Sequence, residues 1–182
     1  FHRISAGLDA EGMPVAWQHR IVGQSIIAGT LFEGGMIKNG VITLPAKDIP
    51  EPFIDVNDIA DVVVAALTEE GHAGEIYEVT GPRTLTFSEL AREISQAAGR
   101  EVQFVQLPQE AFAQAITEAG MPDDIAWLLN YLFETVLDGR NAYVCDGVQR
   151  ALGREPADFA DYARRIAARG TWNVKNGEGL AA

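Results

Sequence analysis

The formal charge of this chain is divided very unevenly, and the change near Gly40 is the sequence feature that most limits how the chain can fold. The first 44 residues carry three acidic and three basic side chains, so their net charge is zero. The whole formal charge of −12 lies downstream: once three of each are taken from the totals of 14 and 26, 11 basic residues face 23 acidic ones. We therefore expect segments of different origin over 1–40 and 41–172, and a flexible tail over 173–182.

Composition narrows the classes of function. A chain of 182 residues with 47% hydrophobic side chains suits one domain with an appendage. Its strong negative charge repels phosphate backbones and anionic lipid, so we expect no nucleic-acid and no membrane partner. No apolar run approaches the roughly 20 residues that cross a bilayer. With the lone Cys145 unable to form an internal disulfide, a cytoplasmic location is expected.

Residues 1–24 have the pattern of a β-hairpin. Strand-like runs over 2–8 and 15–22 flank a turn over 9–12, in which Gly12 supplies backbone freedom. The following residues, up to Gly40, are too rich in glycine for a confident helix. The segment 1–40 is therefore predicted to be a β-hairpin appendage followed by a glycine-rich stretch.

Strand and helix signals alternate after Gly40. Asp58 has the side chain and the position to begin a helix that runs to about Glu70. Thr86 and Glu89 form a capping box, and Gly99 ends the helix that it opens. The predicted strands are 42–44, 52–56, 75–79 and 102–107, and the later helices are 109–119, 122–137, 148–152 and 158–168. This order predicts an α/β fold.

The downstream segment also resembles a known family. The runs that carry the resemblance are PFIDVNDIADV at 52–62, IYEVTGP at 76–82, LTFSELA at 85–91 and GREPADFADYA at 153–163. Together they resemble the C-terminal half of NmrA-like proteins, atypical short-chain dehydrogenase/reductases that bind NAD(P), some of which reduce quinones or azo dyes. The resemblance covers residues 41–172 and implies a partial Rossmann-like fold that contributes the substrate side.

A second, shorter resemblance lies in the first segment. Residues 7–30 resemble an internal stretch of the molybdopterin-binding subunits of bacterial molybdenum hydroxylases, of the isoquinoline oxidoreductase and aldehyde dehydrogenase type. Neither the catalytic glutamate of that family nor a complete pterin-binding loop is recognisable. No molybdenum chemistry is therefore expected.

The sequence offers no place for a dinucleotide. Residues 29–36 have the glycine spacing of a P-loop, but Gly35 and Met36 stand where Lys and Ser/Thr are needed. The glycines at 177–179 are not followed by a helix that could present its N-terminus to a pyrophosphate. NAD(P) is implied by the family resemblance alone, and we expect that this chain by itself does not bind it.

Three side chains are candidates for substrate binding. Arg83 follows a predicted strand and either steers an anionic group or is a solvated loop residue. Trp127 and Tyr131 belong to a helix that is apolar on more than one side, which is typical either of burial against neighbours or a partner chain, or of an aromatic substrate wall. Asp55, Asp58 and Asp61 are better explained by a strand end and a helix start than by a metal site. No catalytic residue is predicted.

Two functions remain open from the sequence. The first is a truncated NAD(P)-dependent reductase of the NmrA-like group, inactive alone, whose full-length relatives transfer hydride to a small quinone- or azo-type acceptor. The second is a nicotinamide-sensing or protein-binding regulatory module without turnover. A homo-oligomer is compatible with both.

Overall fold

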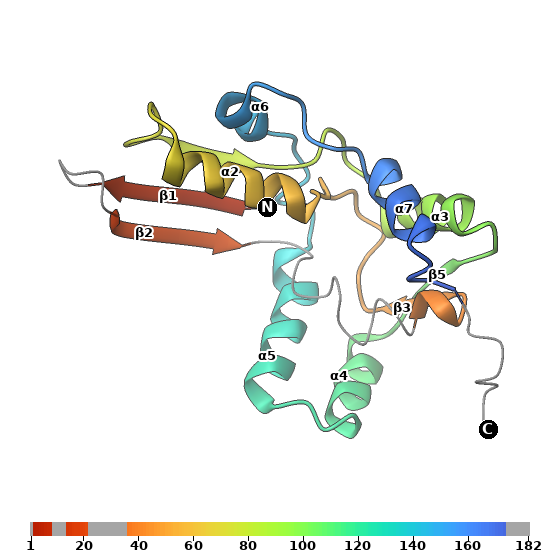
Figure 1. Cartoon of the computed structure of the whole chain (residues 1–182). Coiled ribbons are helices and arrows are strands. Elements are labelled where there is room, and N and C mark those ends of the chain that lie inside the picture. Colours follow the sequence, from red (N-terminus) through yellow and green to blue (C-terminus); the bar gives the residue numbers. More distant parts are fainter. Residues whose placement is uncertain (1, 9–13, 22–35, 174–182) are drawn as a thin grey trace.

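The computed structural model describes residues 2–8, 14–21 and 36–173, and the side chains of 36–173. Strands and helices alternate between residues 41 and 118, which confirms the predicted α/β class (Figure 1). The elements are β1 (His2–Leu8), β2 (Pro14–Ile21), β3 (Val41–Leu44), α2 (Val56–Thr68), β4 (Ile76–Val79), α3 (Phe87–Ala98), β5 (Gln103–Gln106), α4 (Gln109–Glu118), α5 (Asp123–Tyr131), the π-helical turn η2 (Leu132–Val136), α6 (Gly147–Leu152) and α7 (Phe159–Ala168).

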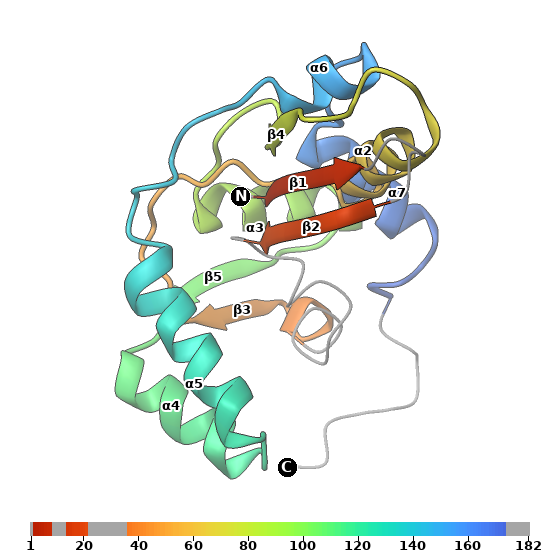
Figure 2. The ribbon, with the colours of Figure 1, turned by 90° about the vertical axis from the view of Figure 1, so that its left-hand side faces the viewer.

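The strands form two small sheets. β1 and β2 pair antiparallel, which confirms the predicted hairpin, and β1 also pairs antiparallel with β4, from His2 opposite Val79 to Ser5 opposite Ile76. β3 and β5 pair in parallel, and Figure 2 shows them below the hairpin with α4 and α5 side by side beyond them. The glycine-rich stretch predicted after the hairpin, up to residue 35, and the tail from 174 lie outside the described residues.

The strand predicted over 52–56 is wrong. No strand pairing includes residues 52–55; the bridge at this point belongs to the preceding residue, Glu51, whose backbone exchanges two hydrogen bonds of 2.9 Å with that of Leu85. Pro50 and Pro52 have no N–H to donate, and α2 begins directly at Val56, so the segment is too short and too poor in donors to extend the pairing.

The start of α2 differs from the prediction by one turn. Asp55, not Asp58, is the N-cap, and its carboxylate accepts the Asn57 N–H at 2.9 Å. Asp58 is 2% exposed and lies inside the fold, where it binds partners from a distant part of the chain. The capping box of α3 is confirmed: the Thr86 hydroxyl accepts from the Glu89 N–H while the Glu89 carboxylate accepts from the Thr86 N–H.

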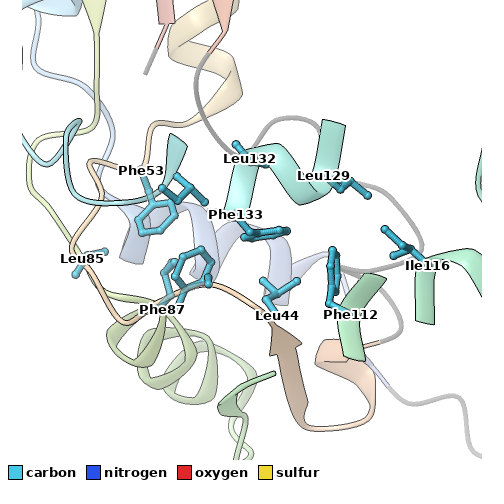
Figure 3. Packing of buried hydrophobic residues seen from close by; sticks show 12 residues of the cluster. Leu44, Phe53, Leu85, Phe87, Phe112, Ile116, Leu129, Leu132 and Phe133 are labelled. Carbon is cyan, nitrogen blue, oxygen red and sulfur yellow. The ribbon is translucent and has the colours of Figure 1, made fainter. Parts of the chain in front are cut away.

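The predicted helix over 122–137 consists of two parts. α5 ends at Tyr131, and η2 continues with wider turns, as the Leu137 N–H donates to the Leu132 carbonyl five residues back. Leu132, Phe133 and Leu137 are all buried, so the wider turn brings three large side chains into the core. Figure 3 shows Phe133 close to Leu44 and Phe112 in the largest apolar cluster of the described residues.

Candidate functional site

Three chain segments meet just beyond the carboxyl end of β4. The Gly81 N–H donates to the Pro52 carbonyl at 3.3 Å, and the Cys145 N–H donates to the buried Thr80 hydroxyl at 2.9 Å. A Cβ at Gly81 would lie 1.9 Å from the Phe53 carbonyl oxygen, so only glycine permits this approach. Ligands of open α/β sheets bind outside the carboxyl ends of the strands, which makes this junction the natural place to look for a site.

Glu51 is the most unusual side chain at this junction. It is 6% exposed, and its Oε1 atom has no hydrogen-bond partner among the described residues. Burial, and to a smaller extent the negative charge of Asp138, raise the pKa of Glu51 to about 7. The sequence analysis missed this residue, although an acid between Pro50 and Pro52 in an otherwise apolar stretch was a signal that could have identified it.

A surface ion pair lies in the loop that follows η2. The Arg140 guanidinium binds the Asp138 carboxylate through two hydrogen bonds of 2.9 and 2.7 Å, and these lower the pKa of Asp138 to about 2. Asp138 is close enough for its charge to act on Glu51, and Tyr131 is close enough to act on Arg140.

Trp127 and Tyr131 form an exposed aromatic pair on α5, here called the aromatic shelf. Their ring centroids are 5.4 Å apart and their planes differ by 11°, so the rings are stacked. Trp127 is 65% exposed and Tyr131 is 45% exposed, although the opposite side of the helix buries Leu129 in the core. Gln109 Nε2 donates to Asn130 Oδ1 at 2.8 Å and ties α4 to α5, so the shelf stands on a fixed helix.

Arg83 lies in a different setting. Its guanidinium makes two hydrogen bonds to Asp158, of 2.6 and 2.7 Å, and a third of 2.6 Å to Glu93. The hydrogen bonds that Arg83 donates to Asp158, the N-cap of α7, are the main cause that raises the pKa of Arg83. The structure thus joins Arg83 to α3 and α7, whereas Trp127 and Tyr131 lie together on α5.

The three aspartates near the start of α2 bind arginines. The Asp55 carboxylate lies 2.5 Å from Arg165, and Arg154 lies 2.6 Å from both Asp58 and Asp61. Within the part of the chain that the structure describes, no group of His, Cys, Asp and Glu side chains has the arrangement of a metal site. The aspartates hold α2 to the segments that precede and form α7.

Helix N-termini are where a fold usually holds the pyrophosphate of a dinucleotide. Those in the described part of the chain begin with Asp55, Thr86, Pro108, Pro122, Asp146 and Asp158, and α2, α3, α4, α5 and α7 also carry an acidic residue in the first turn. Negative charge at these positions repels a phosphate, and none of these helices follows a glycine-rich turn from a strand. These residues do not fit a dinucleotide.

Comparison with solved structures defines the class of fold. An NADPH-dependent quinone oxidoreductase of Escherichia coli, solved with NADPH, matches with a TM-score of 0.66 at 23% identity, over 76% of this chain and 50% of that one. A triphenylmethane reductase of Citrobacter matches with a TM-score of 0.62 at 21% identity, over 74% of this chain and 46% of the other. The fold is that of Rossmann-like NAD(P)-binding reductases, present in part.

Sequence comparison then gives the family. The family model of the NmrA-like family matches residues 27–163, and the NAD(P)H azoreductase of Xenophilus azovorans is 38% identical over 138 residues, which are 76% of this chain and 48% of that protein. The chain belongs to the NmrA-like family, a family of NAD(P)-binding oxidoreductases. It spans about half the length of the curated relatives it matches.

These findings leave two sequence predictions where they stood. The first is the junction expected near Gly40: the family match begins upstream of it, at residue 27. The second is the resemblance of residues 7–30 to molybdenum hydroxylase subunits, which these comparisons do not show and which stays a prediction.

None of the helices in the described residues has the length and hydropathy to cross a bilayer.

Proposed function

We propose that residues 41–172 form the acceptor-binding portion of an NAD(P)-dependent reductase for flat aromatic acceptors. The observation that carries the proposal is the aromatic shelf. Two exposed rings stacked at 5.4 Å on successive turns of a fixed helix offer a flat apolar surface on which another ring can stack.

The relatives support this class of acceptor. By name, one reduces azo compounds and another reduces quinones, and both kinds of molecule carry flat conjugated rings. A ring of that kind gains from burial of its faces and from offset stacking, at about 0.5 to 1.5 kcal/mol for each aromatic pair. Trp127 and Tyr131 are the residues of this chain that we assign to that contact.

The chain alone is proposed to be inactive and to bind NADPH without useful affinity. The acidic helix N-termini support the proposal of weak NADPH binding. A pyrophosphate needs N–H donors at a helix N-terminus, and the carboxylates at these N-termini repel it. Arg83 is assigned to holding α3 against α7, since its Nε and Nη2 groups bind Asp158 and Glu93. No step of hydride transfer is assigned to these residues.

The test measures acceptor binding and cofactor binding separately. Duroquinone, a neutral quinone whose ring has no free position, is titrated into the chain and followed by ligand-observed NMR. We expect saturable binding that weakens about five- to tenfold in Trp127→Ala and in Tyr131→Ala, the loss of one stacking contact. Ile125→Ala is the matched control, since Ile125 is an exposed apolar residue on the same helix.

Two results would contradict the proposal. Equal binding by the parent chain, Trp127→Ala and Tyr131→Ala would exclude the shelf as the acceptor surface. Saturable, micromolar NADPH binding in a fluorescence titration, or NADPH oxidation on addition of duroquinone, would show that the chain alone is competent to bind or use the cofactor.

A further inference from the structure

A cavity of about 350 Å³ lies between the C-terminal ends of α3 and α7, away from the aromatic shelf on α5 (Figure 1). It is lined by Ala97, Ala98, Arg100, Ala167, Trp172 and Asn173. A volume of this size is at the lower end of the range of small-molecule sites. The cavity is therefore a second candidate site, and the ligand that it could hold is small.

Trp172 carries a buried donor that has no partner. Its side chain is 2% exposed, and its Nε1 atom has no hydrogen-bond acceptor among the described residues. Buried polar atoms almost always have partners, because a group that loses its water on folding needs a replacement. The indole N–H can only donate, so the missing partner is an acceptor atom. Since Trp172 lines the cavity, a ligand bound there is the natural source of that acceptor.

Arg100 supplies positive charge to the cavity. Its Nη2 group donates to the Ile37 carbonyl and, at 3.3 Å, to the Trp172 carbonyl, so the guanidinium is held from two sides and is tied to the same tryptophan. Among the described residues it pairs with no carboxylate, whereas Arg83 and Arg154 each bind two. A fixed guanidinium without a counter-ion attracts an anion, and it binds a carboxylate well.

The surroundings limit that anion to a single charge. α3 ends at Ala98 and α7 ends at Ala168, and the carbonyl ends of helices carry partial negative charge. Arg100 is the charged residue among the described residues that line the cavity, so it balances one negative charge. A dianion such as phosphate would keep an unbalanced charge there. The alanine side chains of the wall are apolar, which favours a ligand that also carries a short apolar chain.

We propose that this cavity binds a small organic carboxylate with a short apolar chain. One carboxylate oxygen accepts a hydrogen bond from the Trp172 indole N–H, and the Arg100 guanidinium balances the charge. The apolar chain lies against Ala97, Ala98 and Ala167. This site shares no residue with the aromatic shelf, so it does not depend on the proposed function.

Sodium butyrate is the probe, because it has one carboxylate and no aromatic ring that could stack on the shelf. It is titrated into the 182-residue chain at constant ionic strength and followed by proton–nitrogen correlation NMR. We expect a saturable shift of the Trp172 indole N–H signal, with a dissociation constant on the order of millimolar for a ligand of about six heavy atoms. Butyramide has the same chain without the charge and should bind roughly tenfold more weakly.

Two variants test the contacts separately, with the Ala97 amide signal as the measure of binding. Trp172→Phe keeps a ring but has no N–H, so it should bind butyrate about tenfold more weakly, and its missing signal assigns the Trp172 indole. Trp127→Phe, the matched change on α5, should bind like the parent. Ala98→Leu fills the cavity, leaves Arg100 in place and should abolish binding. The amide spectra also show whether each variant keeps the fold.

The possible results either support the inference or overturn it. Weaker binding in Trp172→Phe, loss in Ala98→Leu and a preference for butyrate over butyramide support it. Equal binding by the parent and Trp172→Phe overturns the role of the indole N–H, and equal binding of butyrate and butyramide overturns the choice of a carboxylate. Displacement of butyrate by an equal concentration of phosphate overturns the limit to one charge. A parent chain without a saturable shift overturns the site. The aromatic shelf is unaffected by each of these results, because duroquinone binding tests it separately.

Discussion

The Asp58 carboxylate and the Arg154 guanidinium lie 2.6 Å apart and join α2 to the segment between α6 and α7. Asp58 is 2% exposed and also accepts a hydrogen bond of 2.7 Å from the Ala157 N–H, whereas Arg154 keeps contact with water and shares its charge with the exposed Asp61. The buried Asp58 carboxylate therefore accepts hydrogen bonds from the Arg154 side chain and from the Ala157 backbone, two groups that lie close to it only in the folded chain.

Asp58→Asn should lower the free energy of unfolding by about 2 kcal/mol, because it weakens a charge-assisted hydrogen bond at a buried site. Urea denaturation followed by circular dichroism measures the change. Asp61→Asn is the matched control, since it removes the exposed partner of the same arginine and should cost less than about 1 kcal/mol. Equal losses for the two variants would contradict a special role for the buried carboxylate.

Thr86→Ala should destabilise the fold by about 1 kcal/mol, because the Glu89 N–H at the start of α3 loses its acceptor. A thermal melt measures the effect. Gln96→Ala, an exposed change on the same helix, should shift the melting temperature far less. An unchanged melt for Thr86→Ala would mean that the capping box contributes nothing to stability.

The stability of the chain should depend on pH through Glu51. Its pKa is raised from an ordinary value of 4.5 to about 7, so the folded state holds the proton over a range in which the unfolded state releases it. Stability is fully present below about pH 4.5 and falls as pH rises to about 7, by about 2 to 3 kcal/mol. The hydrogen bonds that lower the pKa of Asp138 act below this window.

Glu51→Gln provides the reference for that measurement, because every other titrating group is retained. The difference in unfolding free energy between the parent and Glu51→Gln should change by this amount between pH 4.5 and pH 8. Parallel pH profiles for the two proteins would show that the carboxyl titrates normally.

Removal of residues 1–21 should lower the melting temperature, because it takes β1 from the edge of β4 and leaves that strand unpaired. Hydrogen exchange gives a second measurement: the β1 amides that pair with β4 should be protected. An unchanged melting temperature together with rapid exchange would instead support the prediction that residues 1–40 are an independent appendage of different origin.

Local signals determined most of the elements. The capping box at Thr86 joins residues three positions apart, and the hairpin needs only its two strands and their turn, so both could be predicted from the sequence. The apolar helix after Pro122 was also predictable. Its outward face was not, because whether Trp127 and Tyr131 are covered depends on which neighbours pack against α5, and in the described structure both rings are exposed.

The family could be predicted from short sequence motifs, and comparison with known proteins confirms it. The surroundings of individual charged side chains could not be predicted from the sequence. Asp58 looked like the start of a helix because the residue that pairs with it lies 96 positions away. The apolar surroundings of Glu51 in the sequence hinted at its burial, but the burial itself arises where distant segments of the chain meet near the end of β4. Propensity and capping act over a few residues and are written in the sequence. Desolvation and long-range ion pairing act between segments that only the folded chain brings together, so the tertiary structure alone decided which carboxylates are buried and what they can bind.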